Sequence, residues 1–247
     1  KSLLSGKIVE FERKYELNGI TNWFNYIIEP IKNRSGEIVG CILNGVDITQ
    51  KKEVELKEIE YHKKISNIYK ETQQSLSYAS YIQKSIFESN SDLNNFFTEH
   101  FILFRSKEKV SGGFYWTHEN DKNCLVVLGD CTGHGVPGSL LTTISIVLLE
   151  RIVKFQHIYS PERILHELNT NFITILNQRK GGIRDGLEMG ICLFNKENNT
   201  IEFAGAKRSM FLVENNEIRE IKGDRSEIGG DGSKTFIKQR IHTEKGT

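Results

Sequence analysis

The sequence predicts an α+β fold in which antiparallel sheets are layered with helices. Short apolar runs typical of strands dominate both ends of the chain, and two long helical patterns stand in its second half. Paired strand-like runs follow the helices, and each pair is joined by an asparagine-rich turn, which is a hairpin signature. Strands, then helices, then hairpins are typical of a layered α+β domain. With 247 residues, 38% of them apolar, the chain suits one large or two ordinary domains with a packed core.

Residues 1–48 are predicted to form a small β-sheet. Apolar and polar residues alternate, though imperfectly, along residues 7–17. Two apolar, β-branched runs within residues 23–44 flank the turn cluster "NRSGE", so this segment is predicted to be an antiparallel hairpin. Pro30 within it suits an edge strand or a bulge.

Residues 49–90 are predicted to form one long linking helix. Asp47 or Thr49 is the expected N-cap, and neither Pro nor Gly occurs from there to Phe87. The apolar or small residues follow the 4-3 spacing of a two-stranded coiled coil, with polar middle positions that lower its stability. We therefore expect a homodimer through residues 54–86; the alternative is a single amphipathic helix lying on its own domain. The seam consists of Tyr61, Ile65, Ile68, Ala79, Ile82 and Ile86.

Residues 91–247 are predicted to form the mixed α+β domain. Strands are expected before two helices, and hairpins after them. Ser160 is the expected N-cap of the second helix, with Pro161 at its favoured first position. The expected strands are residues 101–106, 113–119 and 124–130, the helices 138–155 and 160–179, and the hairpins 189–206 and 209–223.

Charge and cysteine usage exclude several classes of function. A net charge of +1 gives no basic surface for nucleic acid. The four cysteines form no CxxC pair, which favours reduced thiols in the cytoplasm over a disulfide framework. No apolar run approaches the roughly 18–20 residues that span a bilayer. The chain has no initiator Met and stops just after strand-like residues, so we expect a fragment truncated at both ends, whose parent can still carry a membrane anchor upstream.

The stretch "VVLGDCTGHGVPGSLL" is the most informative for chemistry. An apolar strand ends at Asp130, a tight loop places Gly133 and Gly135 around His134, and Pro137 then opens a helix. A carboxylate at the end of a buried strand, followed by permissive glycine backbone, suits a hard cation or a phosphate, since exposed carbonyls add oxygen ligands. The alternative is an ordinary strand–turn–helix junction in which Asp130 is a turn or cap residue.

Several ordered motifs together resemble one protein family. The motifs, in chain order, are "SGGFYW", "VVLGDCTGHGVPGSLLT", "RDGLEMGICLFN", "IEFAGAKRSMFLV" and "EIKGDRSEIGG". They resemble the SpoIIE-type branch of the metal-dependent PPM (PP2C-like) serine/threonine phosphatases, whose fold is a layered sandwich of antiparallel sheets with flanking helices. Residues 24–52 are similar to the last strands of a PAS sensor domain and its exit into a signalling helix. The chain is thus divided into a partial PAS-like domain (1–48), a signalling helix (49–90) and a truncated phosphatase domain (91–247).

The resemblance implies hydrolysis of a phosphoserine or phosphothreonine ester with two Mn²⁺ or Mg²⁺ ions, which generate a hydroxide and stabilise charge on the phosphoryl group. Asp130 matches the catalytic, metal-bridging aspartate, and Cys131 matches the residue whose backbone carbonyl binds metal. Asp185 and Glu188 match the acidic metal positions of a "DGMD"-like segment, here "DGLE". His134 is expected to make structural hydrogen bonds and not to bind metal.

Two departures from the family pattern bear on activity. The family's first motif reads Ser-Gly-Asp before its aromatic residues, and Gly113 stands where that metal aspartate belongs. Ser111 cannot supply the missing charge. The last metal aspartate, in a Ser-Asp-Gly motif, is expected past Thr247. We therefore expect this chain to bind metal poorly.

Three functions stay open at this point. The first is a sensor-controlled phosphatase acting on a phosphorylated regulatory protein of the anti-sigma-factor-antagonist type in bacterial partner switching. The second is a pseudophosphatase that binds such a phosphoprotein without hydrolysing it. The third is a dimeric α+β domain with no such chemistry. The sequence names neither the sensor's ligand nor the substrate.

Overall fold

The computed structural model describes the chain in two compact units, residues 1–72 and 73–247, and the boundary falls inside a long helix. Each unit is described by itself. The described residues are 6–87, 93–182, 184–214, 217–230 and 234–243.

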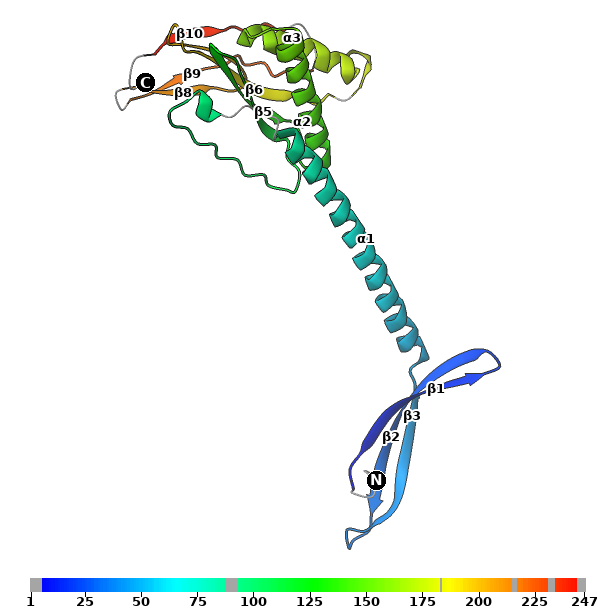
Figure 1. Ribbon diagram of the computed structural model, residues 1–247. Helices are drawn as coiled ribbons and strands as arrows, with labels where there is room; N and C mark the ends of the chain where they lie inside the picture. Colours follow the sequence, from blue (N-terminus) through cyan, green and yellow to red (C-terminus); the bar gives the residue numbers. More distant parts are fainter. Residues whose placement is uncertain (1–5, 88–92, 183, 215–216, 231–233, 244–247) are drawn as a thin grey trace. The chain divides into compact units, whose positions relative to one another are not determined.

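The first unit contains a three-stranded antiparallel sheet of β1 (Val9–Leu17), β2 (Ile20–Lys32) and β3 (Ile38–Asp47), in that order (Figure 1). Asn18 and Gly19 join β1 to β2 with positive φ angles of 52° and 77°, as a two-residue hairpin turn requires. The β2–β3 pair confirms the predicted hairpin.

Helix α1 (Thr49–Phe87) begins where the sequence predicts. Both the backbone N–H and the hydroxyl of Thr49 donate hydrogen bonds to Asp47 Oδ1, at 2.9 and 2.5 Å. These bonds from Thr49 lower the pKa of Asp47. The seam residue Ile65 is 62% exposed, whereas Ile86 packs against the core of the second unit. The predicted boundary at residue 90 lies outside the described residues.

The second unit contains two antiparallel sheets. The larger has the strand order β10-β7-β6-β5-β4, and β8 pairs with β9 in the smaller. This arrangement confirms the predicted α+β class with antiparallel sheets. The strands are β4 (Gly113–Glu119), β5 (Asn123–Cys131), β6 (Leu187–Asn195), β7 (Thr200–Ala206), β8 (Met210–Glu214), β9 (Glu217–Ile221) and β10 (Gln239–His242).

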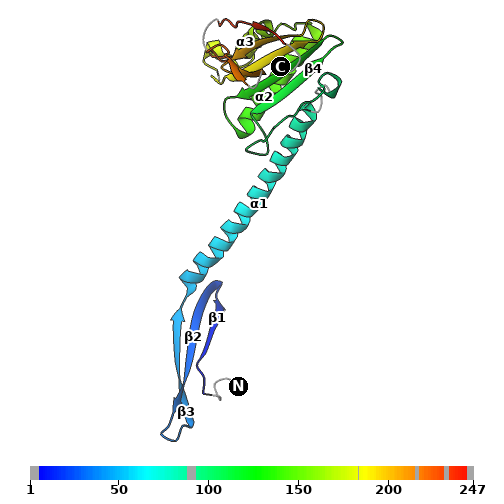
Figure 2. The same cartoon turned by 90° about the vertical axis from the view of Figure 1, so that its left-hand side faces the viewer.

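Helices cover one face of the larger sheet, as Figures 1 and 2 show. The main core lies between them and includes the fully buried Trp116, Leu125 and Leu149. A second, smaller core lies under the β8–β9 hairpin around Phe203. The helices are α2 (Gly135–Glu150), which continues as a short π-helix η3 (Arg151–Phe155), and α3 (Pro161–Ile175), with single 3₁₀ turns η2 (Leu93–Asn95) and η4 (Gln178–Lys180).

The α2–η3 stretch also has the length and apolar composition of a membrane-spanning helix, as no other described helix does. More than half of it is buried inside the unit, against β4 and β5 and beside α3. Because the core helix of a globular domain has the same composition, packing against the sheet accounts for its apolar character.

Two predictions about elements are wrong in detail. Residues 101–106 form no strand: Phe101 is 90% exposed, because no strand of the described chain lies alongside to pair with this segment. Helix α2 starts at Gly135, so Pro137 falls within the first turn, where its missing N–H costs nothing. The prediction that Ser160 is the N-cap of α3 is confirmed, although its hydroxyl donates to the Glu162 carboxylate at 2.7 Å and not to a backbone group.

Candidate functional site

Three neighbouring strands bring predicted site residues side by side. Gly113 of β4 pairs with Asp130 of β5, and Asp130 pairs with Glu188 of β6. Directly opposed residues of antiparallel strands project their side chains to the same face. Asp130 therefore lies between Gly113, which has no side chain, and the Glu188 carboxylate. These three residues form a row across the sheet.

The backbone at Gly113 has room for a carboxylate. A Cβ atom added there would lie 3.6 Å from Asp130 Oδ1 and 3.7 Å from Ser111 Oγ, which are ordinary van der Waals distances. The Ser111 hydroxyl accepts a hydrogen bond from Gly113 N at 3.1 Å and donates one to Gly113 O at 2.9 Å. An aspartate at position 113 would thus face Asp130, whereas the present chain supplies no side-chain oxygen there.

Arg208 is the site residue that the sequence analysis missed. It lies in the turn between β7 and β8, and its guanidinium contacts the carboxylates of Asp130 and Glu188. Nη2 is 2.7 Å from Asp130 Oδ2, and Nε is 3.3 Å from Glu188 Oε2. The only signal in the sequence is a basic residue in a turn, and nothing local shows that this turn folds back over β5 and β6.

Cys131 turns its thiol away from the row and into the core. The residue is 4% exposed, and Sγ lies 3.7 Å from Thr142 Oγ1 and 3.9 Å from Ser145 Oγ. Burial raises the pKa of the Cys131 thiol to about 11, although these two hydroxyls act in the opposite direction. The charges of Asp130 and Asp185 also raise this pKa.

Asp185 is placed by the loop that precedes β6. Its carbonyl accepts a hydrogen bond from Gln178 Nε2 at 2.7 Å, and Gln178 is almost fully buried. The next residue, Gly186, exchanges hydrogen bonds with Thr132, through Thr132 N to Gly186 O and Gly186 N to Thr132 Oγ1, both at 2.9 Å. The loop after Asp130 is therefore tied directly to the "DGLE" segment.

The glycine-rich loop after β5 needs its glycines for close packing and backbone shape. Gly133 and Gly135 have positive φ angles of 87° and 66°. A Cβ on Gly138 would lie 2.7 Å from Gly133 O, a contact that real Cβ atoms do not make. The exposed His134 pairs through Nδ1 with Glu108 Oε1 at 2.6 Å, which agrees with the expected structural role.

A cavity of about 880 Å³ opens beside this row. Its wall includes Gly113, Asp130, Arg208 and His134, and one side is formed by residues 103–108. The Asp130–Arg208 pair is therefore accessible to a ligand that enters the cavity.

Helix α1 reaches the site through Gln83. Gln83 is 6% exposed and is the buried residue of α1. Its amide makes two hydrogen bonds to the Ser111 backbone, from Nε2 to Ser111 O at 2.7 Å and from Ser111 N to Oε1 at 2.9 Å. The backbone at Ser111 in turn sets the position of Gly113, two residues along.

The antiparallel sheets, the helices on one face and the aspartate at the end of β5 define a PP2C-like domain. The family model of stage II sporulation protein E (SpoIIE) matches residues 120–247, more than half of the 247-residue chain. The chain belongs to the SpoIIE family.

One solved structure shows the same fold, and two others are similar at a lower level. The SiaA-PP2C domain of Pseudomonas aeruginosa is similar with 29% identity and a TM-score of 0.65, over 72% of this chain and 70% of that chain. The RsbU and RsbW domains of a Mycobacterium tuberculosis protein match with 12% identity and a TM-score of 0.48, over 57% of this chain and 38% of theirs. The PP2C phosphatase domain of SpoIIE from Bacillus subtilis, with a regulatory-domain fragment, matches with 16% identity and a TM-score of 0.45, over 55% and 39%. No curated protein matches the chain.

Family membership implies dependence on a divalent metal, Mg²⁺ or Mn²⁺, in general. Within the ranges that the structure describes, no three His, Cys, Asp or Glu side chains come together to hold an ion. Gly113 offers no ligand, and the Asp130 and Glu188 carboxylates are already paired with Arg208. The residues present therefore do not fit a two-ion site.

Proposed function

We propose that this chain is a sensor-controlled signalling module that recognises phosphoserine or phosphothreonine on a regulatory protein. Its membership in the SpoIIE family and its likeness to the SiaA-PP2C domain support a phosphatase-type role. The proposed partner class is an anti-sigma-factor antagonist or a similar regulator of bacterial partner switching, and the proposed location is the cytoplasm. The proposed domains are a partial PAS-like sensor (1–48), a signalling helix (49–90) and the phosphatase-family domain (91–247).

The geometry best supports recognition of the phosphorylated partner with little or no hydrolysis. The observation that carries this conclusion is Gly113, which faces Asp130 across the β4–β5 pair and has no carboxylate. Hard divalent cations need several oxygen ligands, and each lost carboxylate weakens the site. A phosphoprotein-binding domain requires no such ligand set, so it is compatible with the site as it stands.

Metal-dependent hydrolysis with Mn²⁺ or Mg²⁺ is the second candidate function. Asp130 favours it, because a side chain that is 53% exposed at the wall of the cavity is placed for chemistry and contributes little to packing. The ligands in that case would be the carboxylates of Asp130, Asp185 and Glu188 with the Cys131 carbonyl. A pure binding scaffold has little physical need for this carboxylate and the glycine loop behind it.

Phosphate release from a phosphoserine peptide in the presence of Mn²⁺ separates the two candidates. We expect the unsubstituted chain to stay near the background rate and Gly113→Asp to exceed it by about tenfold or more, since a restored ligand strengthens metal binding on this scale. Adding Asp130→Asn to the Gly113→Asp variant should return the rate to background. If the unsubstituted chain is already as fast as Gly113→Asp, the role given to Gly113 is wrong. Binding of the phosphorylated over the unphosphorylated peptide, measured by fluorescence anisotropy, tests recognition independently.

We also propose that helix α1 carries the sensor's signal to the site. The Gln83–Ser111 pair supports this, because it joins the helix to the strand that begins at Gly113. A shift of α1 along or about its axis would displace Ser111, which is the type of two-state movement that signalling helices use. The rate of hydrogen exchange at the Ser111 amide, measured with and without the Gln83→Leu substitution, tests this coupling.

A further inference from the structure

Arg208 occupies the place between two carboxylates that would otherwise repel one another. Asp130 and Glu188 are directly opposed on β5 and β6, and like charges in such positions destabilise a sheet. The guanidinium lies 2.7 Å from the first carboxylate and 3.3 Å from the second. It supplies one permanent positive charge, because arginine stays protonated at any working pH.

The backbone at Arg208 is closely packed. Its backbone oxygen is enclosed by two glycines: a Cβ on Gly205 would lie 2.1 Å from it, and one on Gly223 2.3 Å. The preceding residue, Lys207, has a φ of 55°, and its N–H donates to Asp224 O at 2.8 Å. The backbone of the turn is therefore constrained, and it places Arg208 beside β5 and β6.

Arg208 is paired with Asp130 and Glu188, two of the carboxylates that the family resemblance assigns to metal. Arg208 takes Asp130 Oδ2 and Glu188 Oε2, and no other carboxylate joins them in the row, because position 113 is glycine. A divalent ion entering here must displace the guanidinium or accept a partly engaged ligand set. The residues therefore do not fit a two-ion site for two reasons. Gly113 supplies no carboxylate, and Arg208 is paired with Asp130 and Glu188.

We infer that the Arg208 guanidinium neutralises Asp130 and Glu188 in place of a metal ion, and that it competes with divalent metal for these two carboxylates. The inference rests on the metal dependence of the family, which is the basis of the second candidate function. The test measures metal affinity and folding stability and does not measure hydrolysis. The inference and the proposed function can therefore fail separately.

The experiment measures Mn²⁺ binding to the whole purified chain by isothermal titration calorimetry. Arg208→Gln keeps a polar side chain of similar reach and removes the charge, and we expect it to tighten Mn²⁺ binding by about tenfold, the equivalent of two partly exposed ion pairs. Lys122→Gln is the control, since the exposed Lys122 pairs with Glu197 and lies at the opposite end of β5 from Asp130, and it should leave Mn²⁺ affinity unchanged. The same substitution is repeated in a Gly113→Asp background, where the added carboxylate makes metal binding measurable.

Thermal unfolding supplies the second readout. The unsubstituted chain should have the same Tm in EDTA and in Mn²⁺, whereas Arg208→Gln should lose Tm in EDTA and regain it with Mn²⁺, because a bound ion stabilises the folded state. Arg208→Lys keeps the charge and should bind Mn²⁺ more weakly than Arg208→Gln. If removing Arg208 tightens Mn²⁺ binding in neither background, the inference is overturned.

Discussion

Asp130 and Cys131 are adjacent in the chain and have opposite surroundings. The Asp130 side chain is 53% exposed at the cavity, and Cys131 is 4% exposed in the core. Successive residues of a strand point to opposite faces, so the alternation of β5 alone produces this contrast. The aspartate is therefore available for chemistry and the thiol is not.

Alkylation should distinguish the buried thiols from the exposed one. Burial raises the pKa of Cys131 to about 11 from an ordinary value of 9.0, which lowers its thiolate fraction about a hundredfold near neutral pH. We expect iodoacetamide to modify the exposed Cys41 in the native chain and to reach Cys131 only after unfolding in urea. Peptide mass spectrometry over time measures both rates. Equal rates for the two thiols would contradict the buried position of Cys131.

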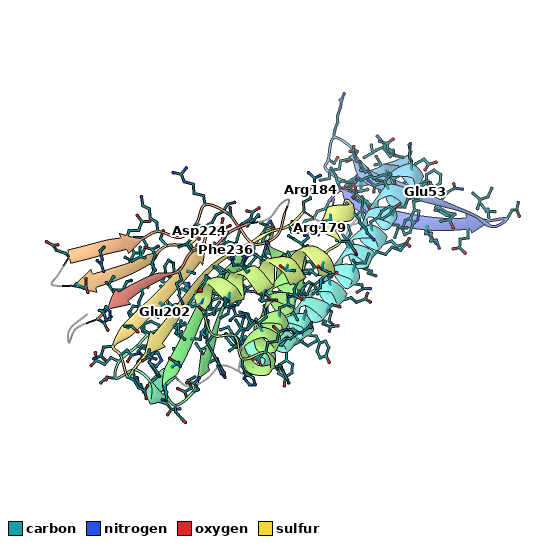
Figure 3. All side chains as sticks on the ribbon, turned by 90° about the horizontal axis from the view of Figure 1, so that it is seen from above. Glu53, Arg179, Arg184, Glu202, Asp224 and Phe236 are labelled. Atoms are coloured by element: carbon teal, nitrogen blue, oxygen red, sulfur yellow. The ribbon has the colours of Figure 1, made fainter. Side chains whose placement is uncertain are left out.

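At the scale of elements, one carboxylate fastens the edge strand β10 to β7. Glu202 of β7, labelled in Figure 3, accepts hydrogen bonds from Arg240 Nε at 2.9 Å and from Lys238 Nζ at 3.0 Å. Its side chain is only 11% exposed. Burial by itself would raise the pKa of Glu202, but the two cations outweigh burial and lower it. β10 is short, so these contacts supply a large part of its attachment.

The Glu202 contacts should give the fold an acid-sensitive contribution. Because the folded pKa is lowered, the stabilisation is present above the unfolded value of about 4.5 and is lost as pH falls through the folded value. We expect Glu202→Gln to lose about 1–3 kcal/mol of unfolding free energy at neutral pH, with the difference shrinking in acid. Thermal unfolding followed across pH measures it. Glu197→Gln is the control, because its pair with Lys122 is exposed and should contribute almost nothing.

At the scale of the whole molecule, the middle of α1 presents an apolar stripe without a described partner. Tyr61, Ile65 and Ile68 are each more than 60% exposed, whereas Ile86 and Phe87, at the end of α1, pack against the main core of the second unit, to which they belong. The homodimer through residues 54–86 stays a prediction, and this stripe is the surface that it would bury. The alternative, a single amphipathic helix lying on its own domain, also stays open.

Size-exclusion chromatography with light scattering tests the dimer. Ile65→Asp with Ile82→Asp places charges in the seam, and we expect the chain to change from dimer to monomer, because charged residues at core positions of a coiled coil are not compensated. Lys63→Asp, off the seam, should leave the mass unchanged. A monomer before and after the substitutions would remove the dimer from the proposal.

Local pattern predicted most elements and pointed to Asp130 and its glycine loop, whereas Gly113, Asp185 and Glu188 were proposed from the family resemblance. The run ending at Asp130 and the positive-φ glycines after it follow from apolar length and turn chemistry, which are local. Arg208 could not be predicted this way, because its role depends on how the β7–β8 turn lies across β5 and β6. Residues 101–106 show the converse error: their strand-like composition is real, but a strand also needs a neighbour to bond, and sequence pattern does not supply one.

The fluorescence of each tryptophan can report on the unfolding of one of the two compact units. Its two tryptophans fall one in each compact unit. Trp116 is fully buried and donates from Nε1 to Glu150 at 3.0 Å, and the half-buried Trp23 has Lys52 Nζ 5.7 Å from its ring centre. Replacing either by phenylalanine leaves a fluorescence signal from a single unit, so two single-tryptophan variants follow the melting of the β1–β3 sheet and of the phosphatase-family domain separately.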